Sequence, residues 1–231
     1  PVEDVRHVLV VKLWGVGNWA LLRPIVRDVR ARFPAARLSV LTLEPNRALV
    51  ADLADDLHLV RPTGVLRAAR DLARATWRLR RDPPDLALDF EPFAHAGALA
   101  ARLARARQRL GFDTPGRARR HLYTVTVPLR ADAHAARSFR DLAEAAGVPP
   151  APYVPGHLAP SAAGLAQTAP LRAAGPYALV HPGSGDNFPG RRWSEAGFAA
   201  AARALGERGL RVLVTGGAGE RDLAERVARA A

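Results

Sequence analysis

Short apolar runs alternate with longer helical segments along most of this chain, and no other feature of the sequence constrains its fold as strongly. The first run, residues 7–13 (HVLVVKL), is apolar at almost every position, as expected of a parallel strand covered on both faces. Residues 18–33 then have the spacing of a helix, with Asn18 as the expected N-cap and Pro24 as an expected distortion. This alternation favours a doubly wound parallel sheet.

The same pattern predicts the remaining elements and a division into domains. We expect strands at 37–43, 57–60, 86–90, 108–112 and 122–127, and helices at 46–53, 65–81, 94–107 and 131–146. The helix at 65–81 is strongly amphipathic, with arginines on its outer face. Residues 147–176 are rich in Pro, Ala and Gly and show no long periodic run, which is typical of a linker.

The alternation of strands and helices then resumes, with strands expected at 177–181 and 210–215 and helices at 193–208 and 219–231. Two such strand–helix units make half of a Rossmann-like domain, so we expect the second domain to be truncated. The predicted organisation is a first domain over 1–150, a linker over 151–175 and the beginning of a second domain over 176–231.

Composition excludes several classes of site and leaves the meaning of the charge open. The chain has no cysteine and no histidine pair at zinc-binding spacing, so we expect no disulfide and no metal site. No apolar run approaches the roughly 18 residues of a membrane span, and no signal peptide is evident, which predicts an intracellular protein. The net charge of +12 comes from arginine, since Lys12 is the only lysine. Such charge suits nucleic acid, anionic lipid or a phosphorylated substrate, but arginine-rich codon usage explains it equally well.

A glycine turn, Gly15-Val16-Gly17, follows the first strand and precedes a helix. Glycines at such a turn allow close approach of a ligand to the backbone, and the helix N-terminus offers free N–H groups. The turn partly matches a dinucleotide-binding fingerprint, with Glu44 at the end of the second strand as the acidic partner. A plain tight turn explains it as well, so both alternatives stay open.

Two further glycine-containing segments follow the strands of the second domain. In residues 181–193 (HPGSGDNFPGRRW), Ser184 and the loop amides can donate to a phosphate, and Arg191 and Arg192 can form charge-assisted contacts with it. The alternative is a solvated loop whose arginines pair with nearby acids. In residues 215–222 (TGGAGERD), Glu220 can either cap the following helix or accept bonds from a ribose.

Three stretches together resemble glycosyltransferase family 9, which includes the ADP-heptose:lipopolysaccharide heptosyltransferases. They are VVKLWGVGNWALLRPIVRDVRARFPAARLSVLT, RQRLGFDTPGRARRHLYT and YALVHPGSGDNFPGRRWSEAGFAAAARALGERGLRVLVTGGAGERDLAERVA. The resemblance implies the GT-B architecture, in which two Rossmann-like domains hold the acceptor (N-terminal domain) and the nucleotide-sugar (C-terminal domain). It also implies sugar transfer from a diphosphate to an acceptor hydroxyl, with inversion.

The resemblance assigns roles to individual residues. For the acceptor it implies Arg119 and Arg120, and for the donor it implies Ser184, Arg192 and Glu220. The glycine turn itself adds Gly15 and Gly17 to the expected acceptor contact. The two later segments add His181, Gly183, Gly185, Arg191 and Gly216 to the expected donor site. For catalysis it implies Arg192, where the family has a basic residue before a Trp, and Asn18, where the family has its proposed catalytic base.

The residue at that base position is a departure from the family pattern, because the amide of Asn18 cannot act as a general base. Asp89 and Glu91, at the end of an expected strand, are the alternative carboxylates, although helix capping or plain surface charge would explain both. A second departure is that this chain does not contain the family's later D-x-G-x-x-H segment.

The sequence therefore predicts a glycosyltransferase that moves heptose or a related sugar from an ADP-heptose-like donor, with no tightly bound cofactor. The expected acceptor is an anionic glycolipid or glycan of lipopolysaccharide type. The expected setting is the cytoplasm, with peripheral contact with the inner membrane and no nucleic-acid partner. Two other functions stay open, namely a non-catalytic nucleotide-binding module and, on the glycine turn and Glu44 alone, an NAD(P)-dependent oxidoreductase.

Overall fold

The chain folds into two compact units, which span Pro1–Leu158 and Ala159–Ala231. The structure, a computed structural model, describes residues 4–130, 132–156, 159–185 and 189–231. Among these residues, no helix combines the length and apolar character needed to cross a membrane.

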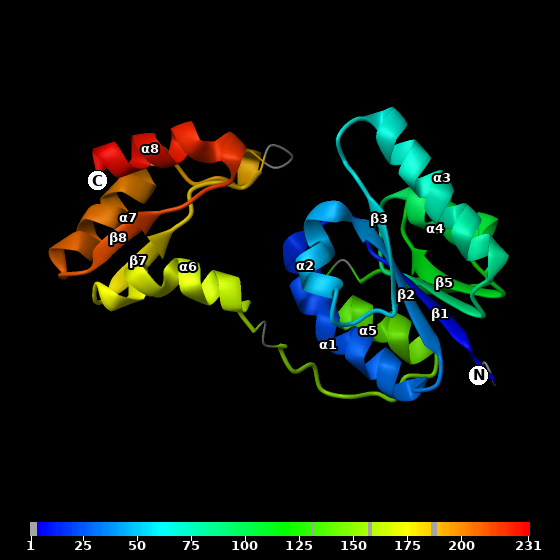
Figure 1. The fold of residues 1–231 in the computed structure, drawn as a ribbon. Coiled ribbons are helices and arrows are strands. Elements are labelled where there is room, and N and C mark those ends of the chain that lie inside the picture. The colour runs from blue at the N-terminus through cyan, green and yellow to red at the C-terminus, as the bar shows by residue number, and fades with distance from the viewer. Residues whose placement is uncertain (1–3, 131, 157–158, 186–188) are drawn as a thin grey trace. The chain divides into compact units, whose positions relative to one another are not determined.

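A six-stranded parallel sheet in the order β3-β2-β1-β4-β5-β6 forms the centre of the first unit (Figure 1). Its strands are β1 (His7–Val11), β2 (Arg37–Leu43), β3 (Asp56–Val60), β4 (Leu86–Asp89), β5 (Gln108–Asp113) and β6 (Val125–Pro128). The helices are α1 (Val16–Arg32), α2 (Arg47–Val50), α3 (Val65–Arg81), α4 (His95–Leu103) and α5 (Ala135–Ala145). The strand order runs outward in both directions from the β1–β4 pair, which confirms the predicted doubly wound sheet.

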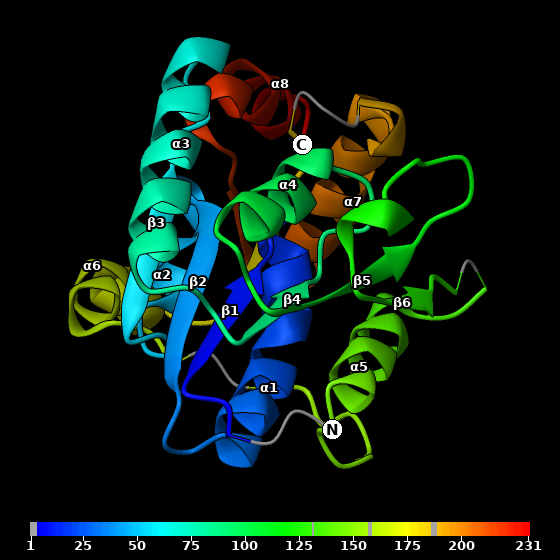
Figure 2. The same ribbon diagram turned by 90° about the vertical axis from the view of Figure 1, so that its right-hand side faces the viewer.

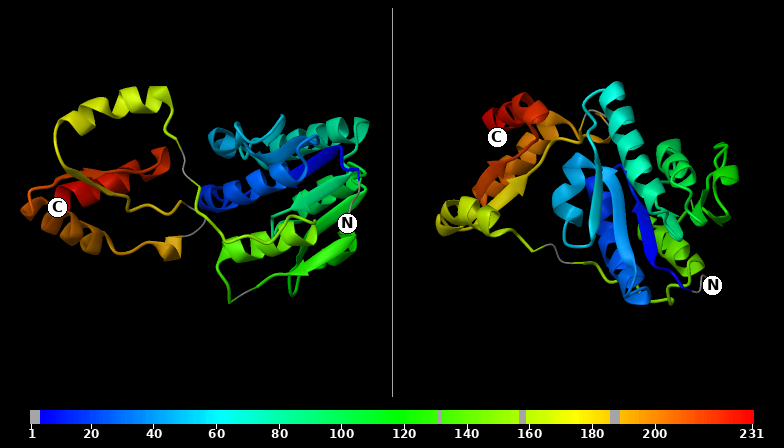
Figure 3. Two further views of the ribbon diagram at one scale, coloured as in Figure 1. Left: turned by 90° about the horizontal axis from the view of Figure 1, so that it is seen from below. Right: turned by 45° about the vertical axis from the view of Figure 1, so that its right-hand side comes forward.

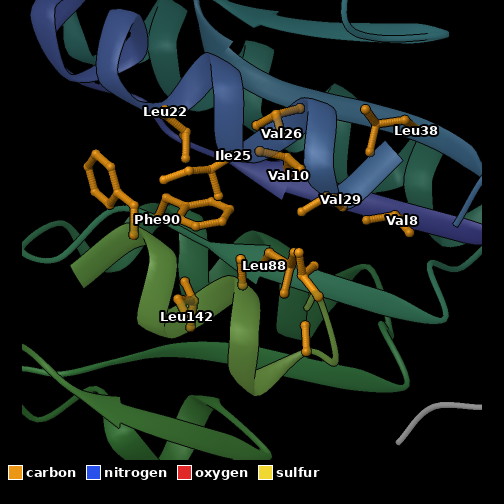
Figure 4. Packing of buried hydrophobic residues seen from close by; sticks show 14 of the residues in the cluster. Val8, Val10, Leu22, Ile25, Val26, Val29, Leu38, Leu88, Phe90 and Leu142 are labelled. Atoms are coloured by element: carbon orange, nitrogen blue, oxygen red, sulfur yellow. The ribbon is translucent and has the colours of Figure 1, made fainter. Parts of the chain in front are cut away.

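Helices cover both faces of this sheet, which explains why its strands are apolar at successive positions. Val8 and Val10 of β1 pack in one buried cluster with α1 and α5 (Figure 4), whereas Leu9 and Val11 pack in another with α3 and α4. Figure 2 shows the two helix pairs on opposite sides of the strands. Because alternate side chains of a strand point to opposite faces, both sets must be apolar here.

Two buried side chains hold the ends of β1 and β2 together. The indole Nε1 of Trp19 donates to the carbonyl of Lys12 at 3.0 Å and to Thr42 Oγ1 at 2.9 Å. The amide of Asn46 donates to the carbonyl of Leu13 at 2.9 Å. These bonds satisfy backbone groups beyond the last ladder pairs, so the segment after β1 is fixed before the glycine turn begins.

The second unit contains a parallel pair of strands, β7 (Tyr177–Val180) and β8 (Arg211–Val214). Helices α7 (Glu195–Glu207) and α8 (Arg221–Ala230) contact each other and the strands. Helix α6 (Ala162–Ala173) lies on the other side of the pair (Figures 1 and 3). The strand–helix alternation predicted for residues 177–231 is confirmed.

Several element boundaries differ from the sequence expectation for identifiable reasons. Helix α1 begins at Val16, so its N-cap is Gly15, with φ of 89°, and the prediction that Asn18 caps it is wrong. Pro24 lies inside α1 without ending it. A 3-10 turn at Arg120–Leu122 delays β6 until Val125.

The region predicted to be a linker without regular structure contains α6. The Ser161 hydroxyl accepts a hydrogen bond from Gly164 N–H at 3.0 Å, and this N-cap starts the helix. The helix has few large apolar residues and no buried residue, so its sequence carries little amphipathic signal. Residues 157–158 of the predicted linker lie outside the described residues.

A substitution at Gly97 tests how closely α4 packs against the strands. A Cβ at Gly97 would lie 2.6 Å from Val11 Cγ1 and 3.1 Å from Asp89 Oδ1. We expect Gly97→Ala to lower the free energy of unfolding of the first unit by about 1–3 kcal/mol, as overpacking does. Chemical denaturation measures this change, with Gly17→Ala in α1 as the control because a Cβ there meets nothing within 4 Å. Equal stability of the two variants would contradict the close packing.

Candidate functional site

The ends of β1 and β4 form a topological switch point, where ligands generally bind in open α/β sheets. After β1 the chain turns into α1 on one face of the sheet, and after β4 it leads to α4 on the other. Of the residues predicted from sequence, Gly15, Gly17, Asn18, Asp89 and Glu91 all belong to these two segments. The structure therefore brings the predicted first-domain residues to one edge of the sheet.

Glu91 connects the two segments through buried contacts. Its Oε2 accepts a hydrogen bond from Lys12 Nζ at 2.8 Å and another from the backbone N–H of Trp14 at 3.1 Å. The side chains of Lys12 and Glu91 are 1% and 5% exposed, so this ion pair is removed from solvent. The carboxylate of Glu91 thus holds the residue directly before the glycine turn.

Asp89 is the centre of a second buried cluster. Its Oδ2 accepts hydrogen bonds from the Tyr123 hydroxyl at 2.7 Å and from Arg119 Nη2 at 2.9 Å, and Arg119 Nη2 also contacts the Tyr123 hydroxyl. Its Oδ1 accepts the N–H of Glu91 at 3.0 Å. A Cβ at Gly111 would overlap the ring of Tyr123, so glycine is needed there for the ring to reach Asp89.

Burial controls the protonation of this cluster. It raises the pKa of Asp89 to about 6, although Arg119 and the Tyr123 hydrogen bond act in the opposite direction. The ionised form of Asp89 is favoured by Arg119 and by the hydrogen bonds that Tyr123 and the N–H of Glu91 donate to it. Burial, followed by the Asp89 charge, raises the pKa of Tyr123, so its hydroxyl keeps the proton that it donates.

These contacts place three of the residues predicted from sequence in the interior of the first unit. Arg119 is fully buried and bonds Asp89, so it does not face an acceptor as the resemblance implied. Asp89 and Glu91 are 1% and 4% exposed, and both carboxylates hold neighbouring groups, so in this structure they act as positioning groups. Arg120 is exposed and stays a candidate for acceptor contact.

Sequence reasoning missed Lys12 and Tyr123. Lys12 is the one lysine in a chain whose other 33 basic residues are arginine, and this departure from the composition was a usable signal for it. No signal marked Tyr123, because its contact with Asp89 spans 34 residues.

The exposed part of this edge is the glycine turn itself. Gly15, Gly17 and Asn18 are exposed, and Gly15 has a positive φ of 89° that favours glycine. A Cβ at Gly15 would lie 2.9 Å from Asn18 Nδ2, so the Asn18 side chain lies over Gly15 at the start of α1. An amide in this position can both donate and accept hydrogen bonds.

In the second unit, Glu220 joins the two predicted loops. Its Oε1 accepts the N–H of Gly185 at 2.8 Å, and its Oε2 accepts the N–H of Gly217 at 2.9 Å. Its Oε2 also lies 3.8 Å from His181 Nε2. The Gly217 N–H and then the Gly185 N–H lower the pKa of Glu220, so the two bonds persist until the pH falls below the usual glutamate range.

Glycine is required at two positions around this carboxylate. A Cβ at Gly183 would overlap the Glu220 carboxylate, and one at Gly216 would lie 3.2 Å from Glu220 Cβ. Of the two roles considered for Glu220, the structure therefore shows the structural one, because it bonds backbone N–H groups of both loops.

Arg192 lies on the loop that follows β7. Its Nε donates to Ser184 Oγ at 3.2 Å, and its Nη2 donates to the carbonyl of Gly185 at 3.2 Å. Arg191 ends a 3-10 turn over Pro189–Arg191. Trp193 is 60% exposed, and its ring packs edge-on against Phe198. Residues 186–188 of this motif lie outside the described residues.

The arrangement combines a guanidinium, a hydroxyl and glycine amides at the carboxyl ends of two parallel strands. All eight predicted donor residues belong to the segments that follow β7 and β8. Such a loop set can bind a phosphate group through charge-assisted hydrogen bonds. Within the described residues, no group of three His, Asp or Glu side chains is placed to hold a metal ion.

A family model for glycosyltransferase family 9 (heptosyltransferase) matches residues 72–231. The chain belongs to glycosyltransferase family 9. This match covers most of the chain and includes the Asp89 cluster and both loops of the second unit, and it identifies the protein as a glycosyltransferase. A comparison with curated protein sequences finds no significant match.

Solved structures share the fold. A glycosyl transferase family 9 structure from Veillonella parvula DSM 2008 matches with a TM-score of 0.81 at 18% identity, over 99% of this chain and 68% of that one. An ADP-heptose lps heptosyltransferase II from E. coli matches with a TM-score of 0.74 at 20% identity, over 98% of this chain and 69% of that one. The E. coli heptosyltransferase WaaC with ADP matches with a TM-score of 0.66 at 19% identity, over 96% of this chain and 71% of that one. The GT-B fold predicted from sequence is confirmed.

The buried Lys12–Glu91 pair provides a stability test of the site. We expect Lys12→Met to lower the free energy of unfolding by about 3–5 kcal/mol, because it leaves the Glu91 carboxylate buried without a counter-charge. Lys12→Met/Glu91→Gln removes both charges and keeps an acceptor for Trp14 N–H, so it should recover most of the loss. Chemical denaturation of the two variants and of Glu91→Gln completes the double-mutant cycle. Additive effects would show that the pair is not coupled.

Proposed function

We propose that this protein transfers a heptose or related sugar from a nucleotide-diphosphate donor, ADP-heptose or a close analogue, to an anionic glycan or glycolipid of lipopolysaccharide type. The observation that carries the proposal is the loop arrangement in the second unit, where Arg192, Ser184 and Gly185 are joined by hydrogen bonds and braced by Glu220. The related structures of E. coli, one an ADP-heptose enzyme and one solved with ADP, support this choice of donor.

In the proposed reaction, the acceptor hydroxyl oxygen forms a bond to the anomeric carbon while the bond from that carbon to the diphosphate oxygen breaks. The hydroxyl proton leaves to a base, and the nucleoside diphosphate leaves with an additional negative charge. Arg192 would offset that charge, since a guanidinium forms bidentate contacts with phosphate oxygens. Arg191, Ser184, His181 and the glycines of the two loops complete the proposed donor site.

On the acceptor side, we propose that Gly15, Gly17 and Asn18 line the contact with the accepting sugar, with Arg120 contributing positive charge. Asn18 would orient the acceptor hydroxyl by hydrogen bonding. Asp89 and Glu91 act as positioning residues in this scheme, because their carboxylates hold the segment that precedes the glycine turn. We place the reaction in the cytoplasm.

A second candidate function is a nucleotide-binding member of the family without transfer activity. The observation that favours it is the state of the three candidate catalytic side chains on the acceptor side, where Asn18 is an amide and both carboxylates are buried. Full-length protein that binds ADP-heptose without turnover would support this alternative. The oxidoreductase interpretation loses its support for two reasons. Glu44, its proposed acidic partner, forms an ion pair with Arg47 at 2.9 Å, and the matching family model describes glycosyltransferases.

Calorimetry of the full-length protein with ADP-heptose, other nucleotide-sugars and NADH separates these functions. We expect binding of a nucleotide-sugar, and release of the nucleoside diphosphate when acceptor is added. Binding of NADH alone would refute the proposal.

Replacing Arg192 tests the donor site. We expect Arg192→Ala to lower kcat/KM at least about tenfold, which corresponds to about 1.4 kcal/mol of transition-state stabilisation. Steady-state assays of diphosphate release measure the effect. Arg208→Ala is the matched control, since Arg208 is an exposed arginine just beyond α7. Unchanged kinetics for Arg192→Ala would remove this residue from the donor site.

Glu220 tests whether the two loops must be held together for donor binding. In Glu220→Gln, one carboxylate oxygen becomes an NH2 group that cannot accept an N–H, so one of the two loop bonds is lost. We expect a several-fold weaker affinity for ADP in calorimetry, with little change in thermal unfolding. Equal affinity of the variant and the original protein would show that the loops bind independently of this bridge.

A further inference from the structure

Helix α3 presents an apolar strip and a row of arginines to solvent on the first unit. Leu66 is 87% exposed and Trp77 is 54% exposed, with Ala69 and Ala73 exposed between them. Spacings of three and four residues place these four side chains along one side of the helix. Single exposed apolar residues are common on protein surfaces, so the strip indicates a binding surface only if the residues beside it do so as well.

Arginines border this strip along its length. Arg67, Arg70 and Arg74 are exposed at successive turns and, with Arg61 and Leu66, line a surface hollow of about 470 Å³. Toward the end of the helix, the guanidinium of Arg81 lies 3.6 Å from the centroid of the Trp77 ring. This stacking keeps a positive charge beside the last apolar residue of the strip.

Little acidic charge offsets these arginines. Asp71 is the one acidic residue of α3, and it is 7% exposed and bound by Arg61 through contacts of 2.8 and 2.7 Å. Within the described part of the chain, no carboxylate forms an ion pair with Arg67, Arg70 or Arg74. Arg78 differs, because it lines a hollow together with Asp56 and Asp82, and we leave it out of the surface.

The opposite flank of the same helix is apolar. Val65 is 84% exposed and borders a groove of about 500 Å³. That groove is lined largely by apolar side chains, among them Leu13, Trp14, Leu43, Val60 and Leu72. The start of α3 therefore offers exposed Val65 and Leu66 between an apolar groove and a cationic hollow.

We propose that this surface of α3, formed by Val65, Leu66, Trp77, Arg67, Arg70 and Arg74, docks on an anionic phospholipid bilayer. Leucine and tryptophan side chains bordered by arginines are the composition of helices that lie in a membrane interface, with apolar groups below the headgroups and cations among the phosphates. A nucleic acid would satisfy the arginines but leave Val65, Leu66 and Trp77 in water. The proposal assigns a surface to the peripheral membrane contact that the family resemblance led us to expect, and it does not depend on the donor or the acceptor.

Vesicle sedimentation of the full-length protein tests this docking. We expect the protein to sediment with phosphatidylcholine vesicles that contain phosphatidylglycerol and to stay in solution with vesicles of phosphatidylcholine alone. Binding should weaken as salt rises, because exposed charges are screened. Equal binding to both vesicle types, or binding to a DNA duplex without binding to the anionic vesicles, would overturn the proposal.

Variants locate the contact on α3. We expect Arg67→Glu/Arg70→Glu/Arg74→Glu to reduce partitioning onto the anionic vesicles by roughly a hundredfold. The matched control, Arg6→Glu/Arg102→Glu/Arg208→Glu, makes the same change in net charge at exposed arginines elsewhere and should reduce it far less. An equal reduction by both variants would show that net charge alone is responsible and would refute the assignment to α3.

A second variant tests the apolar strip without changing the charge. Leu66→Ser/Trp77→Ser should weaken binding to the anionic vesicles, whereas Val154→Ser, at an exposed apolar residue outside α3, should not. Circular dichroism establishes that each variant is folded before it is used. Full binding by Leu66→Ser/Trp77→Ser would show that α3 does not enter the interface.

Discussion

The two buried carboxylates that follow β4 determine how the edge of the first unit's sheet beside the glycine turn is built. Asp89 accepts hydrogen bonds from Arg119, from Tyr123 and from the N–H of Glu91. Glu91 in turn accepts bonds from Lys12 and from the N–H of Trp14. Two charges that would be costly alone in the interior are thus paired, and their remaining oxygen sites hold backbone groups. The position of the glycine turn follows from this network.

In the second unit, too, a carboxylate holds backbone N–H groups, and the Glu220 side chain that does so is 11% exposed. Glu220 accepts N–H groups from the loops that follow β7 and β8, and Gly183 and Gly216 leave room for it. In both units a carboxylate therefore fixes loops at the carboxyl ends of parallel strands, where open α/β sheets bind their ligands.

The glycine turn has the geometry expected of a sugar contact, but its Asn18 side chain is an amide and cannot act as a general base. The turn has the exposed amide and glycines that a sugar contact needs, yet its two nearby carboxylates have structural partners. The leaving-group stabilisation proposed for Arg192 would account for much of a transfer reaction, since electrostatic stabilisation of developing charge commonly contributes more to catalysis than any other effect. The proposed chemistry therefore depends more on the second unit than on a base beside the glycine turn.

Apart from α6, the sequence by itself determined the order of strands and helices, the doubly wound class and the segments that carry the site. Apolar runs such as 7–13 and glycines after strands are local features of the sequence. Strands, turns and helix starts depend mainly on such local features, so these elements could be predicted. The sequence also placed Asp89 and Glu91 at a strand end, and the two glycine-containing motifs after β7 and β8.

Only the tertiary structure decided what those side chains do. Arg119 is buried against Asp89 rather than exposed to an acceptor, Glu220 bridges two loops, and Lys12 pairs with Glu91. Each of these contacts joins residues at least 30 positions apart in the chain, apart from the Gly217 bond of Glu220. Their formation depends on which strands become neighbours in the sheet, and a local pattern does not contain that information.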